Sequence, residues 1–271
     1  MKRFLLILLS FTMLSCHVSC SKGNESKLDI EILEVGKADC ILISFKGNTV
    51  VIDTGEEENA SEILSKLDQR KVKKIHTLIL SHFDKDHIGS AAKILERYEV
   101  ESIIESTFSS DRAEYDQYHK AIDPSKTELF QLKKDYSFTI QECEFKILPP
   151  KAKQYDRKED NNASLIVEIH YGDFHFAFLG DAMEERIEEY KSDIHAPFDF
   201  LKLPYHGNYL QNLDSLLELT KPRYTAICDS VKNPSDDKTI ELLEEKGIEH
   251  YETKNGTIRI RSDGKTIQIS Q

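Results

Sequence analysis

Cysteine is scarce in this chain, and its spacing excludes a metal site built on thiolates. Five cysteines occur among 271 residues, and only Cys40, Cys143 and Cys228 lie beyond residue 20. Each sits in its own apolar run and none has a Cys-x-x-Cys partner, whereas thiolate sites typically use such pairs. Three is an odd number, so we expect buried free thiols, with one disulfide as the alternative in an oxidising compartment.

Positive charge is also in short supply. The chain has 48 acidic and 36 basic residues, a formal net charge of -12. Because an acidic protein repels phosphate backbones at long range, nucleic acid is disfavoured as a partner unless a local basic patch attracts it. The 39% hydrophobic and 31% charged residues are typical of a folded globular protein and exclude a disordered or membrane-embedded one.

The chain has one long apolar run, at residues 4–14, and it is too short to span a bilayer comfortably. Lys2 and Arg3 precede the run and Cys16 follows it, which is the pattern of a secretory signal. We expect residues 1–15 to be a lipoprotein-type signal peptide, whose cleavage leaves Cys16 lipidated. The chain would then be exported and anchored to a bacterial membrane in the cell envelope.

Two alternatives remain open at this end of the chain. Cys20 is a second candidate for lipidation, and a plain cleaved signal peptide would leave no lipid anchor. In either case the polar residues 16–27 are expected to form a tether, and residues 28–271 a folded domain.

Short β-rich runs and amphipathic stretches alternate through the rest of the chain. The expected strands are 28–35, 41–45, 49–52, 75–80, 100–104, 138–140, 144–148, 165–169, 174–179, 198–203, 224–228, 257–260 and 266–269. Helices are expected in the intervals, including a polar helical segment at 109–134 that Pro124 interrupts. Two strand-rich halves with helices outside predict a layered α/β sandwich.

Residues 81–89, SHFDKDHIG, hold the densest cluster of metal-competent side chains. Two histidines frame two aspartates directly after an apolar strand, and a strand end is a rigid place from which side chains can converge on one point. A polar turn between strand and helix is the plain alternative. It explains Ser81, Asp84 and Gly89 but not the paired histidines, so we interpret the loop as a metal site.

Other candidate ligands follow other apolar runs, namely Asp53, Asp181 and His206. A pair of metal ions about 3.5–4 Å apart needs two sets of ligands and a bridging carboxylate. The first set could be His82 and Asp84. The second could be Asp86, His87 and His206, with Asp181 as the bridge between the two ions.

Six motifs in order carry a family resemblance. They are VGKADCILI (35–43), VIDTG (51–55), SHFDKDHIG (81–89), NNASLIV (161–167), LGDA (179–182) and LKLPYHG (201–207). This order resembles the metallo-β-lactamase superfamily, and within it the branch of the ComEC hydrolase domain, with motifs VGQGD, VDTG, SHxDxDHIGG, NNxSL, GD and HHG. The resemblance implies a four-layer αββα sandwich at 28–271, with a dinuclear metal centre at the sheet edge. It assigns the metal ligands as His82, Asp84, Asp86, His87, Asp181 and His206.

The chain departs from the superfamily in ways that affect the metal. Most members have histidine where Asp84 stands, and the region of the third-motif histidine holds Asn161, Asn162 and Ser164. More carboxylates and fewer imidazoles harden the site, so Mn²⁺ competes with Zn²⁺. Tyr205 replaces a histidine that we do not align with a metal ligand.

The resemblance implies hydrolysis by a metal-held hydroxide, because two divalent ions lower the pKa of bound water and polarise the scissile group. Asp86 is the residue expected to orient that hydroxide as well as to bind metal. Asp53 is expected to position a ligand histidine by a hydrogen bond. Lys37, Asn162 and Tyr205 are candidates for substrate contact, although an ion-paired lysine and a turn asparagine would account for the first two.

We therefore predict an exported hydrolase with two divalent ions, Zn²⁺ or Mn²⁺, acting on a phosphoester. The substrate could be a small molecule or a polymer, either nucleic acid or a cell-envelope phosphodiester. A non-catalytic binding module that keeps the fold is the alternative, motivated by Ala38 and Tyr205 at positions where the branch has glycine and histidine. A purely structural envelope lipoprotein would leave the ligand cluster unexplained.

Overall fold

The computed structural model describes residues 27–155 and 159–271. The predicted signal peptide at 1–15, the lipidation candidates Cys16 and Cys20, and all but the last residue of the 16–27 tether lie outside the described residues and stay predictions. In the part of the chain that is described, no helix is long and apolar enough to cross a membrane.

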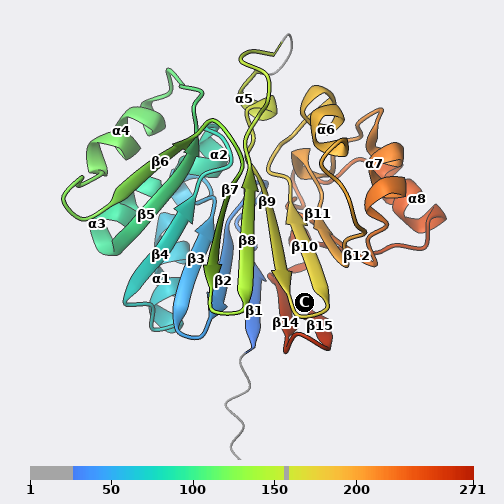
Figure 1. Cartoon of the computed structure of the whole chain (residues 1–271), viewed down its shortest axis with the longest axis horizontal. Helices are drawn as coiled ribbons and strands as arrows, with labels where there is room; N and C mark the ends of the chain where they lie inside the picture. The colour runs from blue at the N-terminus through green and yellow to red at the C-terminus, as the bar shows by residue number, and fades with distance from the viewer. Residues whose placement is uncertain (1–26, 156–158) are drawn as a thin grey trace, which may run out of the picture.

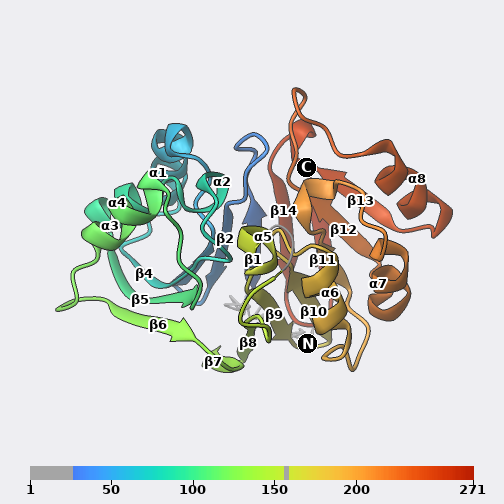
Figure 2. The same cartoon turned by 90° about the horizontal axis from the view of Figure 1, so that it is seen from above.

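Two β-sheets form the inner layers of the molecule (Figures 1 and 2). Within the described residues the first sheet has the strand order β15-β14-β1-β2-β3-β4-β5-β6 and the second β13-β12-β11-β10-β9-β8-β7. The first is built from β1 (Leu28–Ile32), β2 (Ile41–Phe45), β3 (Asn48–Ile52), β4 (Lys74–Ile79), β5 (Glu99–Ser106), β6 (Glu128–Leu132), β14 (Ile258–Ser262) and β15 (Ile267–Ser270). The second is built from β7 (Tyr136–Ile140), β8 (Cys143–Leu148), β9 (Ile166–Tyr171), β10 (Phe174–Phe178), β11 (Phe200–Lys202), β12 (Tyr224–Ile227) and β13 (Glu249–Glu252).

Helices cover the outer faces of both sheets. The first sheet carries α1 (Ala60–Gln69), α2 (Lys85–Ile88), α3 (Ala91–Arg97) and α4 (Ala113–Ala121), and the second carries α6 (Glu184–Lys191), α7 (Leu213–Thr220) and α8 (Asp237–Glu245) (Figure 2). Shorter pieces are α5 (Glu159–Asn162), η1 (Glu57–Asn59), η2 (Tyr205–Gly207) and η3 (Thr253–Asn255). This helix–sheet–sheet–helix order confirms the predicted αββα sandwich.

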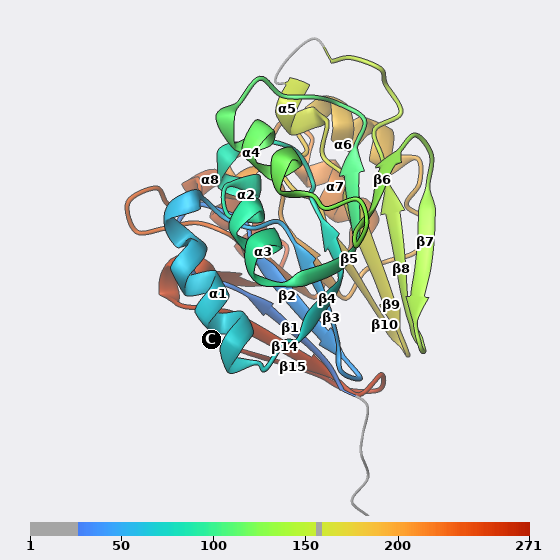
Figure 3. The same ribbon diagram turned by 90° about the vertical axis from the view of Figure 1, so that its left-hand side faces the viewer.

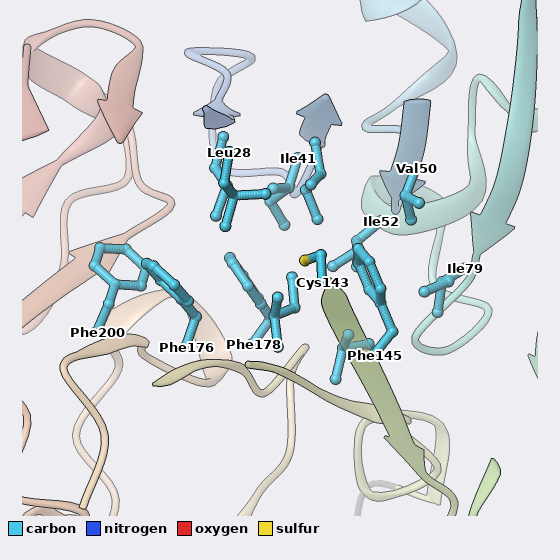
Figure 4. Close-up of a cluster of buried hydrophobic side chains, with 14 of the residues drawn as sticks. Leu28, Ile41, Val50, Ile52, Ile79, Cys143, Phe145, Phe176, Phe178 and Phe200 are labelled. Atoms are coloured by element: carbon cyan, nitrogen blue, oxygen red, sulfur yellow. The ribbon is translucent and has the colours of Figure 1, made fainter. Parts of the chain in front are cut away.

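Three apolar cores hold these four layers together. The central one lies between the sheets, where Phe145, Phe176 and Phe178 face isoleucines of the first sheet (Figure 4). Outer cores pack α1, α3 and α4 on the first sheet, and α6 and α7 on the second. The predicted free thiols are confirmed, because Cys40, Cys143 and Cys228 are all buried and unbridged.

The predicted secondary structure is wrong in the segment 109–134, and strand β13 (Glu249–Glu252) also forms where no strand was predicted. The first half of the segment 109–134 forms α4, but its second half is strand β6, which pairs in parallel with β5 from Glu128 to Leu132. Pro124 ends the helical register, and the edge strand has only one buried residue, Leu132. A strand with so little apolar alternation has no clear period in the sequence, so tertiary pairing decides its conformation.

The buried carboxylate of Glu31 ties three elements of the first sheet layer together. It accepts hydrogen bonds from Arg70 Nε after α1 (3.0 Å) and from Arg259 Nε on β14 (2.7 Å), while Glu31 itself lies on β1. Burial alone would raise the pKa of Glu31, but the two guanidinium groups outweigh it and lower the pKa. Its stabilising effect is therefore present above the ordinary value of 4.5 and is lost as the pH falls through the lowered pKa.

We expect Glu31→Gln to lower the free energy of unfolding by about 1.5–3 kcal/mol at pH 7, because charge-assisted hydrogen bonds to a buried group are lost. Urea unfolding at pH 7 and again near the acid limit of folding would measure the difference between wild type and variant, which should shrink in acid. Glu142→Gln is the matched control, since Glu142 makes an exposed ion pair with Lys46. Equal losses in the two variants would contradict the role given to Glu31.

Candidate metal centre

Strand ends deliver the predicted metal-binding side chains to one edge of the paired sheets. The 81–89 loop follows β4, and its short helix α2 carries Asp86 and His87. Asp181 comes shortly after β10, and η2, which follows β11, holds His206. Figures 1 and 3 both show α2 and α5 at this same end of the molecule.

Four of these side chains form a compact set, which we call the four-donor cluster: Asp86, His87, Asp181 and His206. One candidate ligand atom from each lies within 4.8 Å of all the others. Asp181 is central, because its Oδ1 lies 3.4 Å from His87 Nε2 and its Oδ2 lies 3.2 Å from His206 Nε2. Asp86 Oδ2 lies 3.3 Å from the same nitrogen of His206.

Several donor atoms at this centre are buried without a hydrogen-bond partner among the described residues. They are the Nε2 atoms of His82, His87 and His206 and the Oδ1 atom of Asp181. Buried polar atoms in folded proteins are almost always satisfied, and imidazole nitrogen with carboxylate oxygen is a suitable donor set for Zn²⁺ or Mn²⁺. The residues present therefore fit a divalent metal.

The charges around the centre also favour a cation. Burial alone would lower the pKa of His87 and His206, but the nearby carboxylates outweigh it, raising the pKa of His87 well above its usual value and that of His206 to about 9. The same two histidines hold the pKa of Asp181 well below its ordinary value. By contrast, burial and the neighbouring His87 lower the pKa of His82 to about 4. Because metal ligation needs neutral imidazoles, metal binding would displace protons from His87 and His206.

Asp53 makes the predicted contact with a candidate ligand histidine, His87. Its Oδ2 lies 2.8 Å from His87 Nδ1 and accepts a hydrogen bond from Ser81 Oγ (2.6 Å), while its Oδ1 accepts one from Ser81 N (2.7 Å). In neutral His87 a proton on Nδ1 leaves the lone pair of Nε2 available to a metal ion at the cluster. Asp53 has φ 56°, a left-handed conformation that is rare outside glycine, so the local backbone is shaped to make this contact.

His206 is oriented from behind in a similar way. Its Nδ1 lies 2.9 Å from the carbonyl oxygen of Cys228 at the end of β12, which leaves Nε2 facing Asp86 and Asp181. His206 itself has φ 52° and Gly207 has φ 72°. A Cβ on Gly207 would come within 2.8 Å of side-chain atoms of Ile227 and Ser235, so only glycine fits this turn.

The family model of the metallo-beta-lactamase superfamily matches residues 33–228 of this chain. The chain belongs to the metallo-β-lactamase superfamily. The matched residues carry every member of the four-donor cluster, and the two-sheet sandwich is the superfamily fold.

Two curated relatives confirm the predicted branch within the metallo-β-lactamase superfamily. ComE operon protein 3 of Bacillus subtilis (strain 168) is 25% identical over 264 residues, which cover 87% of this chain and 33% of that protein. Recombination protein 2 of Haemophilus influenzae is 28% identical over 236 residues, covering 85% of this chain and 27% of that protein. The chain thus spans about a third or less of the length of these relatives.

A solved structure agrees on the fold. The metallo-β-lactamase fold protein YhfI from Bacillus subtilis superimposes with a TM-score of 0.56 at 13% identity, over 90% of this chain and 100% of that one. At such low identity the likeness speaks for the fold alone.

The remaining predicted residues of this superfamily member lie in different surroundings. Asp84 stands outside the four-donor cluster, with its Oδ2 3.9 Å from His82 Nε2. Lys37 lines a groove beside Asp86, and Tyr205 is half-buried against the core under α6 and α7. The substrate contact of Asn162 stays a prediction, and its side chain makes a contact within the protein. Its buried Oδ1 accepts the backbone N–H of Met183 (3.0 Å), at the start of α6.

Two residues beneath the centre were missed by the sequence reasoning. Lys202 and Asp39 form an ion pair with side chains 0% and 1% exposed, and Lys202 Nζ also donates to the carbonyl oxygen of Gly180 (3.1 Å), next to Asp181. Asp39 donates its backbone N–H to Asp86 O (3.1 Å). A lysine inside the apolar run FLKL was the available signal, because lysine is almost never fully buried without a partner.

Proposed function

We propose that this chain is a metal-dependent phosphoester hydrolase whose ions are held by His82, Asp84, Asp86, His87, Asp181 and His206. The observation that carries the proposal is the four-donor cluster, in which the Nε2 atoms of His87 and His206 are buried without a hydrogen-bond partner among the described residues. Divalent ions bound there would supply Lewis-acid chemistry, lowering the pKa of water and polarising a phosphoryl oxygen.

The protein's own side chains would divide the remaining work. Asp53 keeps His87 in the right tautomer, and the Cys228 carbonyl does the same for His206. Asp86 is the carboxylate open to a substrate, since its side chain is 22% exposed whereas that of Asp181 is 4% exposed. Asp86 is therefore the group placed to orient an attacking water and to accept its proton.

Basic side chains close to the centre support an anionic substrate, despite the net charge of -12. A groove of about 580 Å³ beside Asp86 is lined by Lys37, Lys85 and Lys232. Lys85 pairs with Glu56, but neither Lys37 nor Lys232 has a carboxylate within 4.0 Å among residues 27–155 and 159–271. Glu56, Glu58 and Asp86 line the same groove, so Lys37 and Lys232 are the two cations there that a phosphoester substrate could contact.

A screen of metals against substrates tests the proposal directly. Purified protein reconstituted with Mn²⁺ or Zn²⁺ would be assayed on a phosphomonoester, a phosphodiester, single-stranded DNA and a β-lactam, with His206→Ala as the blank. Cleavage of a phosphoester by wild type alone is the expected result. Cleavage of the β-lactam alone would overturn the phosphoester class, and metal binding without any turnover would favour the binding-module alternative.

Lys37→Ala is expected to raise KM for a phosphodiester about tenfold with little change in kcat, because a charge-assisted contact to the bound anion is lost while the metal ligands stay in place. Steady-state kinetics at two ionic strengths would measure this, and the effect should shrink at high salt. Lys265→Ala, an exposed lysine in the turn between β14 and β15, is the control. An unchanged KM in Lys37→Ala would remove Lys37 from the substrate groove.

Export and membrane anchoring complete the proposal. The predicted signal peptide and Cys16 would place the hydrolase in the cell envelope, where a phosphodiester of the envelope or incoming nucleic acid could reach it. Radiolabelled fatty acid incorporation into wild type, lost in Cys16→Ser, would test the anchor.

A further inference from the structure

The two halves of the candidate metal centre differ in the number of candidate ligands that they bring together. One half is the four-donor cluster, whose ligand atoms already lie within 4.8 Å of one another. The other half offers His82 and Asp84, with His82 Nε2 3.9 Å from Asp84 Oδ2. In the described part of the chain, no third histidine, cysteine or carboxylate joins these two within the same limit.

The side chains around His82 do not supply the missing ligand. Ser164 Oγ lies 3.4 Å from His82 Nδ1, the nitrogen that faces away from the centre, and it donates to the carbonyl oxygen of Asn161 (2.6 Å). Asn161 turns its amide nitrogen toward Asp181 Oδ2 (3.3 Å), and an amide N–H is a hydrogen-bond donor, not a metal ligand. The half around His82 thus has two donors of its own and would depend on the shared Asp181 for a third, whereas catalytic zinc sites typically have three protein ligands.

A fixed cation also stands beside Asp84. Tyr115 on α4 packs edge-on against Phe83 of the 81–89 loop, with ring centroids 4.7 Å apart. Arg112 precedes Tyr115 by one helical turn, so it faces the same loop. Its Nη2 lies 2.7 Å from Asp84 Oδ1 and 3.3 Å from Asp160 Oδ2, and the Arg112 side chain is only 36% exposed.

We infer that this chain binds one divalent ion tightly, at Asp86, His87, Asp181 and His206, and that Arg112 keeps the His82–Asp84 half weak for a second ion. The inference rests on the proposed function, because it concerns the same centre. Arg112 already neutralises the Asp84 carboxylate, so an incoming ion must share that carboxylate with a guanidinium and also experiences repulsion from it. The predicted pair of ions becomes one resident ion and one that Arg112 opposes.

Titration of metal-free protein with Mn²⁺, followed by calorimetry and by electron paramagnetic resonance, tests the inference without reference to activity. Wild type is expected to bind one ion tightly and a second at least about a hundredfold more weakly, and Arg112→Met should tighten the second ion by about ten- to a hundredfold. Arg97→Met is the matched control, since Arg97 pairs with Asp68 on the surface and should leave both affinities unchanged.

Variants of the two halves keep the test decisive if Arg112→Met does not fold. His206→Ala should lose the tight ion, whereas His82→Ala should keep it. Two ions of equal affinity in wild type would overturn the inference, as would a weaker second ion in Arg112→Met, because Arg112 would then orient Asp84 as a ligand. Failure of wild type to bind any ion would instead overturn the proposed function.

Discussion

Asp181→Asn is expected to lower phosphodiester turnover by about a thousandfold or more, because it removes the carboxylate that lies between the candidate ligands His87 and His206. The Asp181 side chain lies 3.4 Å from His87 and 3.2 Å from His206, and its residue is only 3% exposed. An amide of the same shape keeps the packing but cannot neutralise a divalent ion. Metal content by elemental analysis should fall together with kcat.

A carboxylate away from the centre provides the comparison for that loss. Asp173→Asn changes an exposed aspartate in the turn between β9 and β10 and should leave metal content and turnover unchanged. Thermal unfolding of both variants would separate a lost ligand from a lost fold. Turnover of Asp181→Asn within tenfold of wild type, with a full complement of metal, would remove Asp181 from the centre.

The histidines and aspartates of the centre were predictable because each follows an apolar strand. Strands that run in one direction bring their ends to one sheet edge, so His87, Asp181 and His206 meet although they are distant in the chain. The positions of the four-donor cluster could therefore be predicted from the local sequence pattern. The fold could be predicted in the same way, since most strands show either alternation of apolar and polar residues or a short apolar run.

The residues that surround those ligands follow from tertiary packing, which no local pattern records. Arg112 lies beside Asp84 at the start of α4, whose Tyr115 packs on Phe83, and the sequence around Arg112 reads as an ordinary polar helix. Asn162 belongs to the NNASLIV motif, yet its amide oxygen accepts a hydrogen bond from the backbone of Met183 at the start of α6. The supporting contacts of a site are thus harder to predict than its ligands, and in this chain they alter the expected metal content.

Lys202→Met is expected to lower the free energy of unfolding of the metal-free protein by about 3–5 kcal/mol, because Asp39 would be left as a buried charge without its cation. Burial alone would lower the pKa of Lys202, but Asp39 outweighs it and raises the pKa above its ordinary value. The lysine is therefore charged in the folded protein. Urea unfolding of wild type and variant would measure the loss, with Lys246→Met as the control for a lysine in an exposed pair.

The double variant Asp39→Asn with Lys202→Met separates the cost of an unpaired charge from the worth of the pair. The pair can act mainly by compensating two opposite buried charges. In that case the free energy of unfolding of the double variant should lie within about 1–2 kcal/mol of wild type, since replacing both partners of a buried pair is often close to neutral. Its metal affinity should nevertheless be reduced, because Lys202 also holds the carbonyl oxygen of Gly180 beside Asp181. A loss in the double variant equal to the sum of the losses in Asp39→Asn and Lys202→Met would show instead that Asp39 and Lys202 act independently.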